Sequence, residues 1–123
     1  MKILFNNTIF FNQRFGGISR YFVNLGKSLE NINLDYTVVS PIFKNVYLKK
    51  LNNKKIKGIF LKRYPNYEFI KSLNNFFENE YIKKFKPDIV HDTYYSKNLY
   101  ENIRFKKVIT VHDLIYENFS NYY

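Results

Sequence analysis

Residues 106–112, Lys-Lys-Val-Ile-Thr-Val-His, form the clearest apolar and β-branched run in the chain. Such a run is typical of a β-strand. A similar run, Asp88-Ile-Val-His91, begins directly after Pro87, a residue type that ends a helix. Each run follows a segment with helical periodicity, so the two strands are expected to lie parallel to each other.

Three more strands are expected nearer the N-terminus. The second of them is expected to end at Pro41, because proline cannot donate a hydrogen bond to a sheet ladder. The predicted ranges are Lys2 to Asn6, Asp35 to Ser40 and Gly58 to Leu61.

Helical segments alternate with these strands. Apolar residues from Ile18 recur at helical spacing to about Asn31, whereas the segment Asn7 to Phe15 has no clear period and is expected to be a loop. Glu68 to Phe85 is predicted to be an amphipathic helix, and a shorter helical segment is expected around Ser96 to Ile103. The long helix has an expected apolar side of Phe69, Leu73, Phe76, Phe77 and Tyr81, and an expected polar side of Lys71, Asn75, Glu78 and Lys83.

This alternation of strands and helices determines the expected fold. Strands separated by helices form βαβ units with right-handed crossovers. The expected fold is therefore α/β, a Rossmann-like open parallel sheet with helices on both faces. A length of 123 residues fits one compact domain of this kind.

The composition excludes several classes of protein. With 46% hydrophobic and 20% aromatic residues, the chain has enough apolar surface to fold. It has no cysteine, which rules out disulfides, thiolate metal sites and a cysteine nucleophile. No apolar run approaches the ~20 residues of a membrane span, and the N-terminus lacks the pattern of a signal peptide. We therefore expect a cytoplasmic protein that is at most peripheral to the inner face of the membrane.

The net charge of +10 is concentrated in one segment. Residues 41–63 contain eight Lys and Arg residues and no Asp or Glu. A solvated surface would explain this segment, and so would an anionic partner, either a membrane leaflet or nucleic acid. Of these two partners we favour the membrane. The basic residues are Lys44, Lys49, Lys50, Lys54, Lys55, Lys57, Lys62 and Arg63.

Candidate site residues follow three of the expected strands. In an open parallel sheet, ligands bind beyond the carboxyl ends of the strands, where the strand order reverses. Both histidines, His91 and His112, stand at such ends, and each is followed by an aspartate. The pair Gly16-Gly17 lies between the first strand and the helix that follows. If the strand order is 3-2-1-4-5, all three clusters lie on one rim of the sheet.

The glycine pair is a candidate anion site. Residues without a Cβ let a ligand approach the backbone, and the free N–H groups at the start of a helix favour a phosphate. A turn that requires positive φ would explain the pair as well. Arg20, one turn into the same helix, either reaches an anion or stays exposed to solvent. The dinucleotide signature GxGxxG and the P-loop signature are both absent, which disfavours NAD or FAD and excludes a P-loop nucleotidase.

His112 is the strongest candidate for a catalytic role. A histidine at a strand end more often satisfies backbone groups than it catalyses, but His112 stands among the other candidates. The adjacent Asp113 is expected to cap the following helix. A metal site made of both histidines and both aspartates lacks ligand spacing within any one element, so no metal is expected.

Three stretches of the chain resemble, in order and spacing, the N-terminal domain of family 4 glycosyltransferases. The closest resemblance is to mannosyl- or rhamnosyltransferase-like members that build bacterial surface polysaccharides. The stretches are Phe15-Gly-Gly-Ile-Ser-Arg-Tyr-Phe-Val-Asn-Leu-Gly-Lys-Ser-Leu29, Lys86-Pro-Asp-Ile-Val-His91 and Val108-Ile-Thr-Val-His-Asp-Leu-Ile-Tyr-Glu117. The match extends over nearly the whole chain.

The resemblance implies retaining transfer of a sugar from a nucleotide-sugar to a saccharide or lipid-linked acceptor. It implies a GT-B scaffold of two Rossmann-like domains, with no cofactor, no required metal and no nucleic acid partner. In that family the loop matching Gly16-Gly17 lies near the donor diphosphate and the acceptor, and the histidine matching His112 contacts the donor sugar near the reacting carbon. We therefore predict His112 as the catalytic residue. The predicted substrate-binding residues are Gly16, Gly17, Arg20, His91 and Asp113.

The chain departs from the family pattern in its extent. The donor-binding second domain and the last strands of the first domain have no counterpart in the sequence. Residues 1–123 are accordingly expected to be a truncated acceptor-side domain that transfers no sugar alone. Two alternatives stay open: a basic Rossmann-like module that binds an anionic lipid or nucleic acid, and a truncated gene product with only an interaction role.

Overall fold

The computed structural model describes residues 1–95 and 105–112. The strands in these residues are β1 (Ile3–Phe5), β2 (Tyr36–Phe43), β3 (Ile56–Phe60), β4 (Ile89–Asp92) and β5 (Lys106–Ile109). The helices are α1 (Thr8–Asn12), α2 (Gly17–Asn31), α3 (Val46–Lys49), the short 3-10 helix η1 (Asn53–Lys55) and α4 (Tyr67–Phe85). No helix among the described residues has the length and apolar character needed to cross a bilayer.

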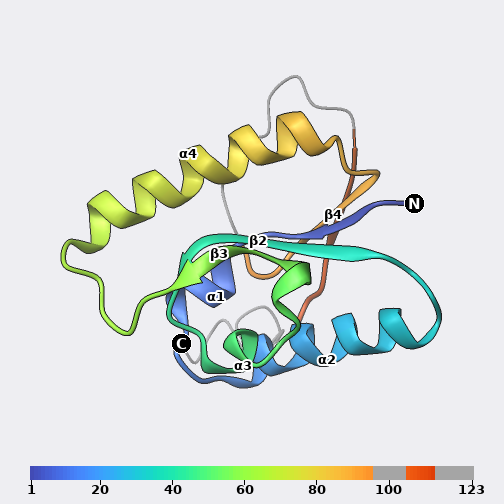
Figure 1. Ribbon diagram of the computed structural model, residues 1–123, viewed down its shortest axis with the longest axis horizontal. Helices are drawn as coiled ribbons and strands as arrows, with labels where there is room; N and C mark the ends of the chain where they lie inside the picture. Colours follow the sequence, from blue (N-terminus) through green and yellow to red (C-terminus); the bar gives the residue numbers. More distant parts are fainter. Residues whose placement is uncertain (96–104, 113–123) are drawn as a thin grey trace, which may run out of the picture.

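The strands form one parallel sheet in the order β3-β2-β1-β4-β5. Helix α4 covers one face of the sheet, and α1, α2 and α3 lie on the other (Figure 1). The predicted α/β fold, a Rossmann-like open parallel sheet with helices on both faces, is confirmed. The chain adds β2 and β3 on one side of β1 and then β4 and β5 on the other, so the strand order reverses beside β1. This is the place where an open α/β sheet binds its ligands.

Both faces of the sheet are packed, because side chains of β1 alternate between them. Ile3 and Phe5 belong to the core under α1 and α2, whereas Leu4 belongs to the core under α4. Burying a side chain of this size contributes about 1.5–3 kcal/mol, so the larger core on the α2 side supplies most of the hydrophobic stabilisation. The larger core includes Phe5, Phe10, Phe22, Tyr36 and Leu48, and the smaller one is Leu4, Val39, Ile82 and Val90.

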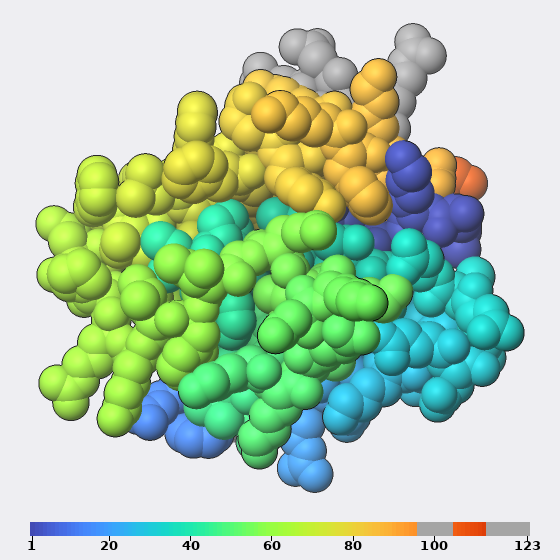
Figure 2. Space-filling model, in the orientation of Figure 1, coloured from blue at the N-terminus to red at the C-terminus, as the bar shows by residue number. Residues whose placement is uncertain are grey.

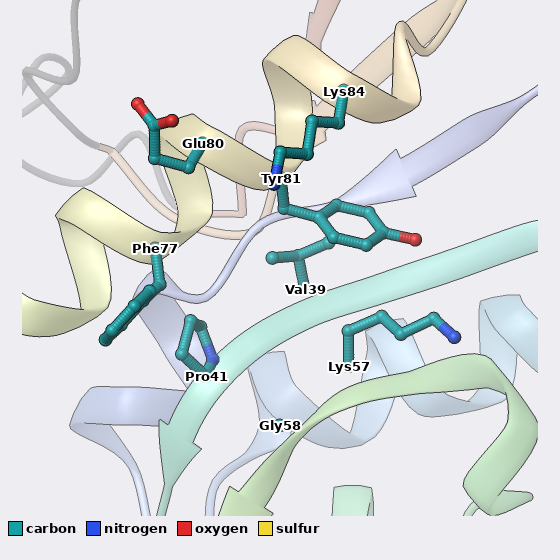
Figure 3. Close-up of a pocket in the computed structure, with 8 residues that line it drawn as sticks. All are labelled: Val39, Pro41, Lys57, Gly58, Phe77, Glu80, Tyr81 and Lys84. Carbon is teal, nitrogen blue, oxygen red and sulfur yellow. The ribbon is translucent and has the colours of Figure 1, made fainter.

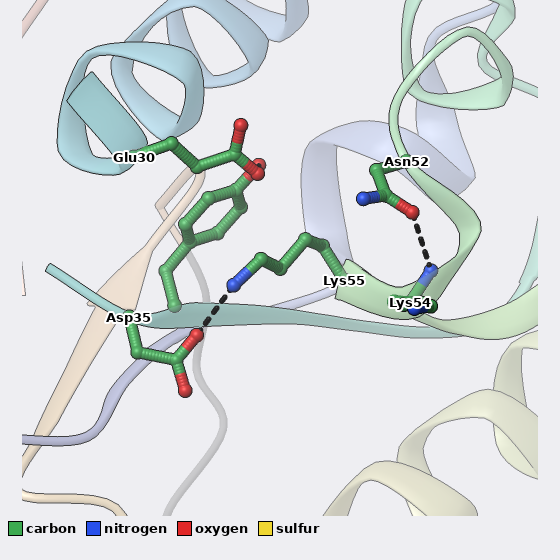
Figure 4. A network of polar contacts seen from close by, with 6 residues as sticks. Glu30, Asp35, Asn52, Lys54 and Lys55 are labelled. Atoms are coloured by element: carbon green, nitrogen blue, oxygen red, sulfur yellow. Dashed lines mark hydrogen bonds and ion pairs between the residues drawn. The ribbon is translucent and has the colours of Figure 1, made fainter. Parts of the chain in front are cut away.

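Helix α2 lies very close to β2 at the end of the sheet where the strands begin. A Cβ on Gly26 would lie 2.7 Å from the buried ring of Tyr36, so only glycine permits this approach. Lys55 of η1 pairs with Asp35 just before β2 (Figure 4), and its Nζ lies 5.3 Å from the Tyr36 ring centre. This hydrogen bond holds the pKa of Asp35 below its usual value. These contacts fix α2, β2 and η1 together at the end of the sheet opposite the candidate site.

The predicted end of the second strand at Pro41 was wrong. Strand β2 continues to Phe43, and its register with β3 shifts between Val39 and Ile42, which accommodates a residue without an N–H group. Beyond Val38 this strand no longer pairs with β1. In this part of β2 the side chain of Asn74 on α4 provides hydrogen bonds in place of β1. It bonds both the N–H (2.8 Å) and the carbonyl (2.7 Å) of Ile42.

The predicted faces of α4 were also wrong. Glu78, expected on the polar side, is completely buried and accepts a hydrogen bond from the backbone N–H of Asn7 at 2.8 Å. The helix turns this side inward because backbone groups near the ends of β1 and β2 need polar partners. Its buried residues are Ile70, Asn74, Glu78 and Ile82. Three rings expected inside are exposed: Phe69 (60%), Phe76 (59%) and Phe77 (50%).

The segment from Asn7 to Phe15, predicted to be a loop, contains α1. Five residues are too few to show a helical period, and contacts far along the chain stabilise this helix instead. The ring of Phe11 stacks on that of Tyr64 with 4.6 Å between centres, and the Tyr64 hydroxyl donates to the Phe11 carbonyl at 2.8 Å. Burial raises the pKa of Tyr64.

The last predicted strand is shorter than residues 106–112. Strand β5 ends at Ile109, which pairs with Asp92, the last residue of its neighbour β4. The short helical segment predicted around Ser96 to Ile103 lies outside the described residues. The other predicted strands and helices agree with the structure apart from small shifts at their ends, whereas α3 and η1 were not predicted.

Candidate functional site

His91 lies at the carboxyl end of β4, packed between rings. The rings of Phe5 and Phe22 approach it edge to face, with centres 5.7 and 4.9 Å away. Its Nε2 lies 2.8 Å from the Oγ1 of Thr110, just beyond β5. His91 is only 9% exposed. Its pKa is lowered mainly by burial and to a smaller extent by the charge of the nearby His112. His91 therefore joins the ends of two strands.

His112 lies on the same rim and is exposed. Its ring centre is 5.2 Å from that of Tyr21 and 6.0 Å from that of Phe22, and both contacts are edge to face. Both histidines therefore contact Phe22, near the start of α2. The three clusters were expected to share one rim if the strand order was 3-2-1-4-5, and the structure places His91, His112 and helix α2 together there. Their chemical roles stay predictions.

The glycine pair opens α2, with Gly16 as its N-cap and Gly17 as its first residue. Gly16 is extended (φ 168°) and Gly17 is the first helical residue, so a turn that requires left-handed φ does not explain the pair. A Cβ on Gly17 would meet nothing within 4 Å, whereas one on Gly16 would meet the movable side chain of Gln13. No side chain caps this helix start, and its first turn has no acidic residue. The first N–H groups of α2 therefore have no capping side chain and lie at the positive end of a helix dipole.

Arg20 and Asp113 complete the predicted site residues. The backbone N–H of Arg20 donates to the Gly16 carbonyl at 3.1 Å, and its side chain is exposed. Phe22 follows two residues later, about 200° further round the helix, so the arginine leaves α2 nearly opposite the ring that touches both histidines. Asp113 lies outside the described residues.

A buried polar network joins the strand ends beneath this rim, and sequence reasoning missed most of it. The Nδ2 of Asn6, after β1, donates to the Oδ1 of Asp92 at 2.8 Å. The Oδ1 of Asn6 accepts from both the N–H (2.9 Å) and the hydroxyl (2.8 Å) of Thr93, after β4. The Nζ of Lys107 on β5 lies 2.9 Å from the Oδ2 of Asp92, which balances the buried charge. The network thus fixes the relative positions of β1, β4 and β5.

The network extends to α1 and α4. The N–H of Ile9 donates to the Thr93 hydroxyl at 3.0 Å, and Glu78 holds the N–H of Asn7. A sequence signal for part of it existed, since Asn6-Asn7 and Thr93 directly follow strands as the histidines do. No signal identified Glu78, because the aromatic residues of α4 indicated a different inner face.

The described residues do not assemble a metal site. Within residues 1–95 and 105–112, no group of three or more His, Cys, Asp or Glu side chains is placed to hold an ion. The carboxylate of Asp92 instead bonds Asn6 and Lys107. The chemistry available at the rim is an uncapped helix start beside an exposed imidazole, with a second imidazole buried behind it.

A scan of protein-family models, a search of curated proteins and a search of solved structures each found no match to this chain. The resemblance to family 4 glycosyltransferases therefore stays a prediction.

We expect the folding stability to depend on pH through His91. Because burial and His112 lower its pKa below the ordinary value of about 6.5, the unfolded chain takes up a proton at a higher pH than the folded chain does. Through this group, the free energy of unfolding is constant well above pH ~6.5 and falls as the pH decreases from ~6.5 toward the folded-state pKa. Urea unfolding curves at a series of pH values measure this loss.

The matched variant is His91→Gln, whose side-chain amide can still bond Thr110. It should flatten the pH dependence in this range, because no group at position 91 then titrates. Ring-proton NMR gives an independent reading, since the chain has only two histidines. A folded-state pKa for His91 above ~6.5 would contradict the burial argument.

Proposed function

We propose that this chain is the acceptor-side domain of a retaining glycosyltransferase of the GT-B type. The enzyme would transfer a mannose- or rhamnose-like sugar from a nucleotide-sugar to a saccharide or lipid-linked acceptor in surface polysaccharide synthesis. One observation carries the proposal: His91, His112 and the start of α2 meet at the carboxyl rim of a parallel sheet, beside the reversal of strand order. The resemblance of three sequence stretches to that family supports it independently.

The uncapped start of α2 would act on the leaving group. In the proposed reaction the bond between the anomeric carbon and a diphosphate oxygen breaks, and the acceptor oxygen forms a new bond on the same face of the sugar. The acceptor proton passes to the departing diphosphate. Negative charge develops on that group, and free N–H groups at the positive end of a helix stabilise it without a metal. Gly17 leaves the space for such a group to approach.

The two histidines would have different roles. His112 is exposed beside the first turns of α2, so its imidazole can contact a sugar hydroxyl near the reacting carbon. His91 is buried, and its bond to Thr110 fixes the backbone two residues before His112. We therefore assign His112 as the residue that contacts the donor sugar and His91 as a positioning residue. This refines the prediction that His91 binds substrate directly.

A transfer assay on the longest natural product of the gene tests the proposal. It uses a panel of nucleotide-sugars with a lipid-linked acceptor extract, and NMR of the product shows whether the anomeric configuration is retained. We further expect residues 1–123 alone to transfer no sugar, because in the proposed enzyme a second domain holds the nucleotide. Turnover by residues 1–123 alone would contradict this division of roles.

Gly17→Val locates the site within that assay. The new side chain enters open space, so the domain should keep its stability while the approach to the α2 start is blocked. Transfer should be lost in Gly17→Val and kept in Asn24→Val, an exposed position further along the same helix. Undiminished transfer by Gly17→Val would move the site away from α2. If neither the longest natural product of the gene nor residues 1–123 transferred any sugar, the binding-module alternative would be favoured.

A further inference from the structure

Helix α4 presents aromatic rings to solvent. Phe69, Phe76 and Phe77, which we call the aromatic stripe, are each at least half exposed, and the rings of Phe76 and Phe77 contact each other with centres 5.5 Å apart. They are exposed because α4 packs on the sheet through its Asn74 and Glu78 side. Clustered apolar groups of this kind on a surface mark an interaction site.

An apolar groove runs beside the aromatic stripe. It lies between α4 and the strands β2 and β3 and has a volume of about 390 Å³ (Figure 3). It is on the opposite face of the sheet from α2, so it is separate from the histidine rim. Figure 3 shows Lys84 extending from α4 and Lys57 from β3 on the two sides of the groove. Its apolar lining includes Val39, Pro41, Phe77 and Tyr81.

The charge around the groove is positive. The groove contains one carboxylate, that of Glu80, whose Oε1 is 3.2 Å from the Nζ of Lys83 and is thereby balanced. Lys57 belongs to the basic segment 41–63, which has no acidic residue. Figure 2 shows that α4 (yellow to gold) and the part of this segment around η1 and β3 (green) share one face of the molecule. Aromatic rings and lysines are therefore combined on the same surface.

We propose that this face, made of the aromatic stripe, the groove and the lysines beside it, docks on an anionic phospholipid membrane. A helix with one apolar flank lies in the plane of the interface with its rings at the boundary between headgroups and acyl chains. Lysines beside it attract the negative leaflet. Single-stranded nucleic acid also combines basic and aromatic contacts, but it needs a charged groove that follows the backbone. Here the groove is mainly apolar.

The proposal does not depend on the proposed sugar transfer, and the chain itself allows a sharp test. It contains no tryptophan, so Phe76→Trp introduces a single fluorescent probe in the stripe. The control is Ile32→Trp, at an equally exposed apolar position after α2 on the other side of the sheet (64% against 59%). Vesicles of equal parts phosphatidylglycerol and phosphatidylcholine should shift the emission of Phe76→Trp to the blue and leave that of Ile32→Trp unchanged.

Two double variants show whether binding depends on the position of the lysines or only on the net charge of the protein. Lys57→Gln with Lys84→Gln should weaken binding to the same vesicles ~30-fold in co-sedimentation. Lys27→Gln with Lys106→Gln removes the same charge from other elements and should have a much smaller effect. Vesicles of phosphatidylcholine alone should bind none of the proteins strongly.

Three results would overturn the proposal. The first is equal emission shifts of Phe76→Trp and Ile32→Trp. The second is tight binding of a single-stranded oligonucleotide through Lys57 and Lys84 with no binding to vesicles, which would favour nucleic acid. The third is self-association of the wild type that Phe76→Ser abolishes, again without vesicle binding, which would make this face an interface between two copies of the chain.

Discussion

Asn6→Ala is expected to lower the free energy of unfolding by about 4 kcal/mol. The side chain of Asn6 is completely buried, donates to Asp92 and accepts two hydrogen bonds from Thr93. Truncation removes these hydrogen bonds from buried groups, including the bond to the Asp92 carboxylate, which keeps its ion pair with Lys107. The loss is measured from urea unfolding curves at a pH near neutrality, where the carboxylate is charged.

Asn24→Ala is the control for Asn6→Ala, because Asn24 is exposed on α2 and its change should alter stability by less than ~0.5 kcal/mol. Thr93→Val should give an intermediate loss, since it removes the hydroxyl but keeps the backbone N–H that donates to Asn6. A loss below ~1 kcal/mol in Asn6→Ala would mean that the network contributes little to holding the strand ends.

Gly58→Ala should destabilise the domain by about 3 kcal/mol. A Cβ on Gly58 would overlap the backbone carbonyl oxygen of Ser40 on the neighbouring strand. The clash is with backbone, so β2 and β3 must separate where their register shifts beside Pro41. The measurement is again the free energy of unfolding in urea.

Gly17→Ala is the matched control for Gly58→Ala, because the same methyl group meets nothing within 4 Å at that position. It should leave stability unchanged or slightly raised, since alanine reduces the entropy of the unfolded chain. Equal stability of the two alanine variants would contradict the close approach of β2 and β3.

The sheet and the rim could be predicted because their signals are local. Short apolar runs that end in His91 and near His112 mark two strands, and in a parallel sheet the carboxyl ends of neighbouring strands lie together. The prediction assumed the strand order 3-2-1-4-5. With that order, both histidines were expected beside the start of α2. The helix start itself was identified from the glycine pair and the period that begins at Ile18.

The errors occurred where tertiary contacts override local patterns. The aromatic residues of α4 indicated an inner face, but the sheet needed the polar groups of Asn74 and Glu78, which bond the backbone of Ile42 and Asn7. Pro41 indicated a strand end, yet a register shift accommodates it. Helix α1 was missed because its stability comes from rings far away in the sequence, such as Tyr64.

The role of His112 is tested by the rate of sugar transfer in the longest natural product of the gene, wild type against His112→Ala. The exposed ring makes few stabilising contacts, so the variant should keep the wild-type unfolding midpoint. If His112 contacts the sugar where charge develops, kcat should fall by about 100-fold or more. A variant that transfers sugar at the wild-type rate would contradict the assignment of the reaction to this rim.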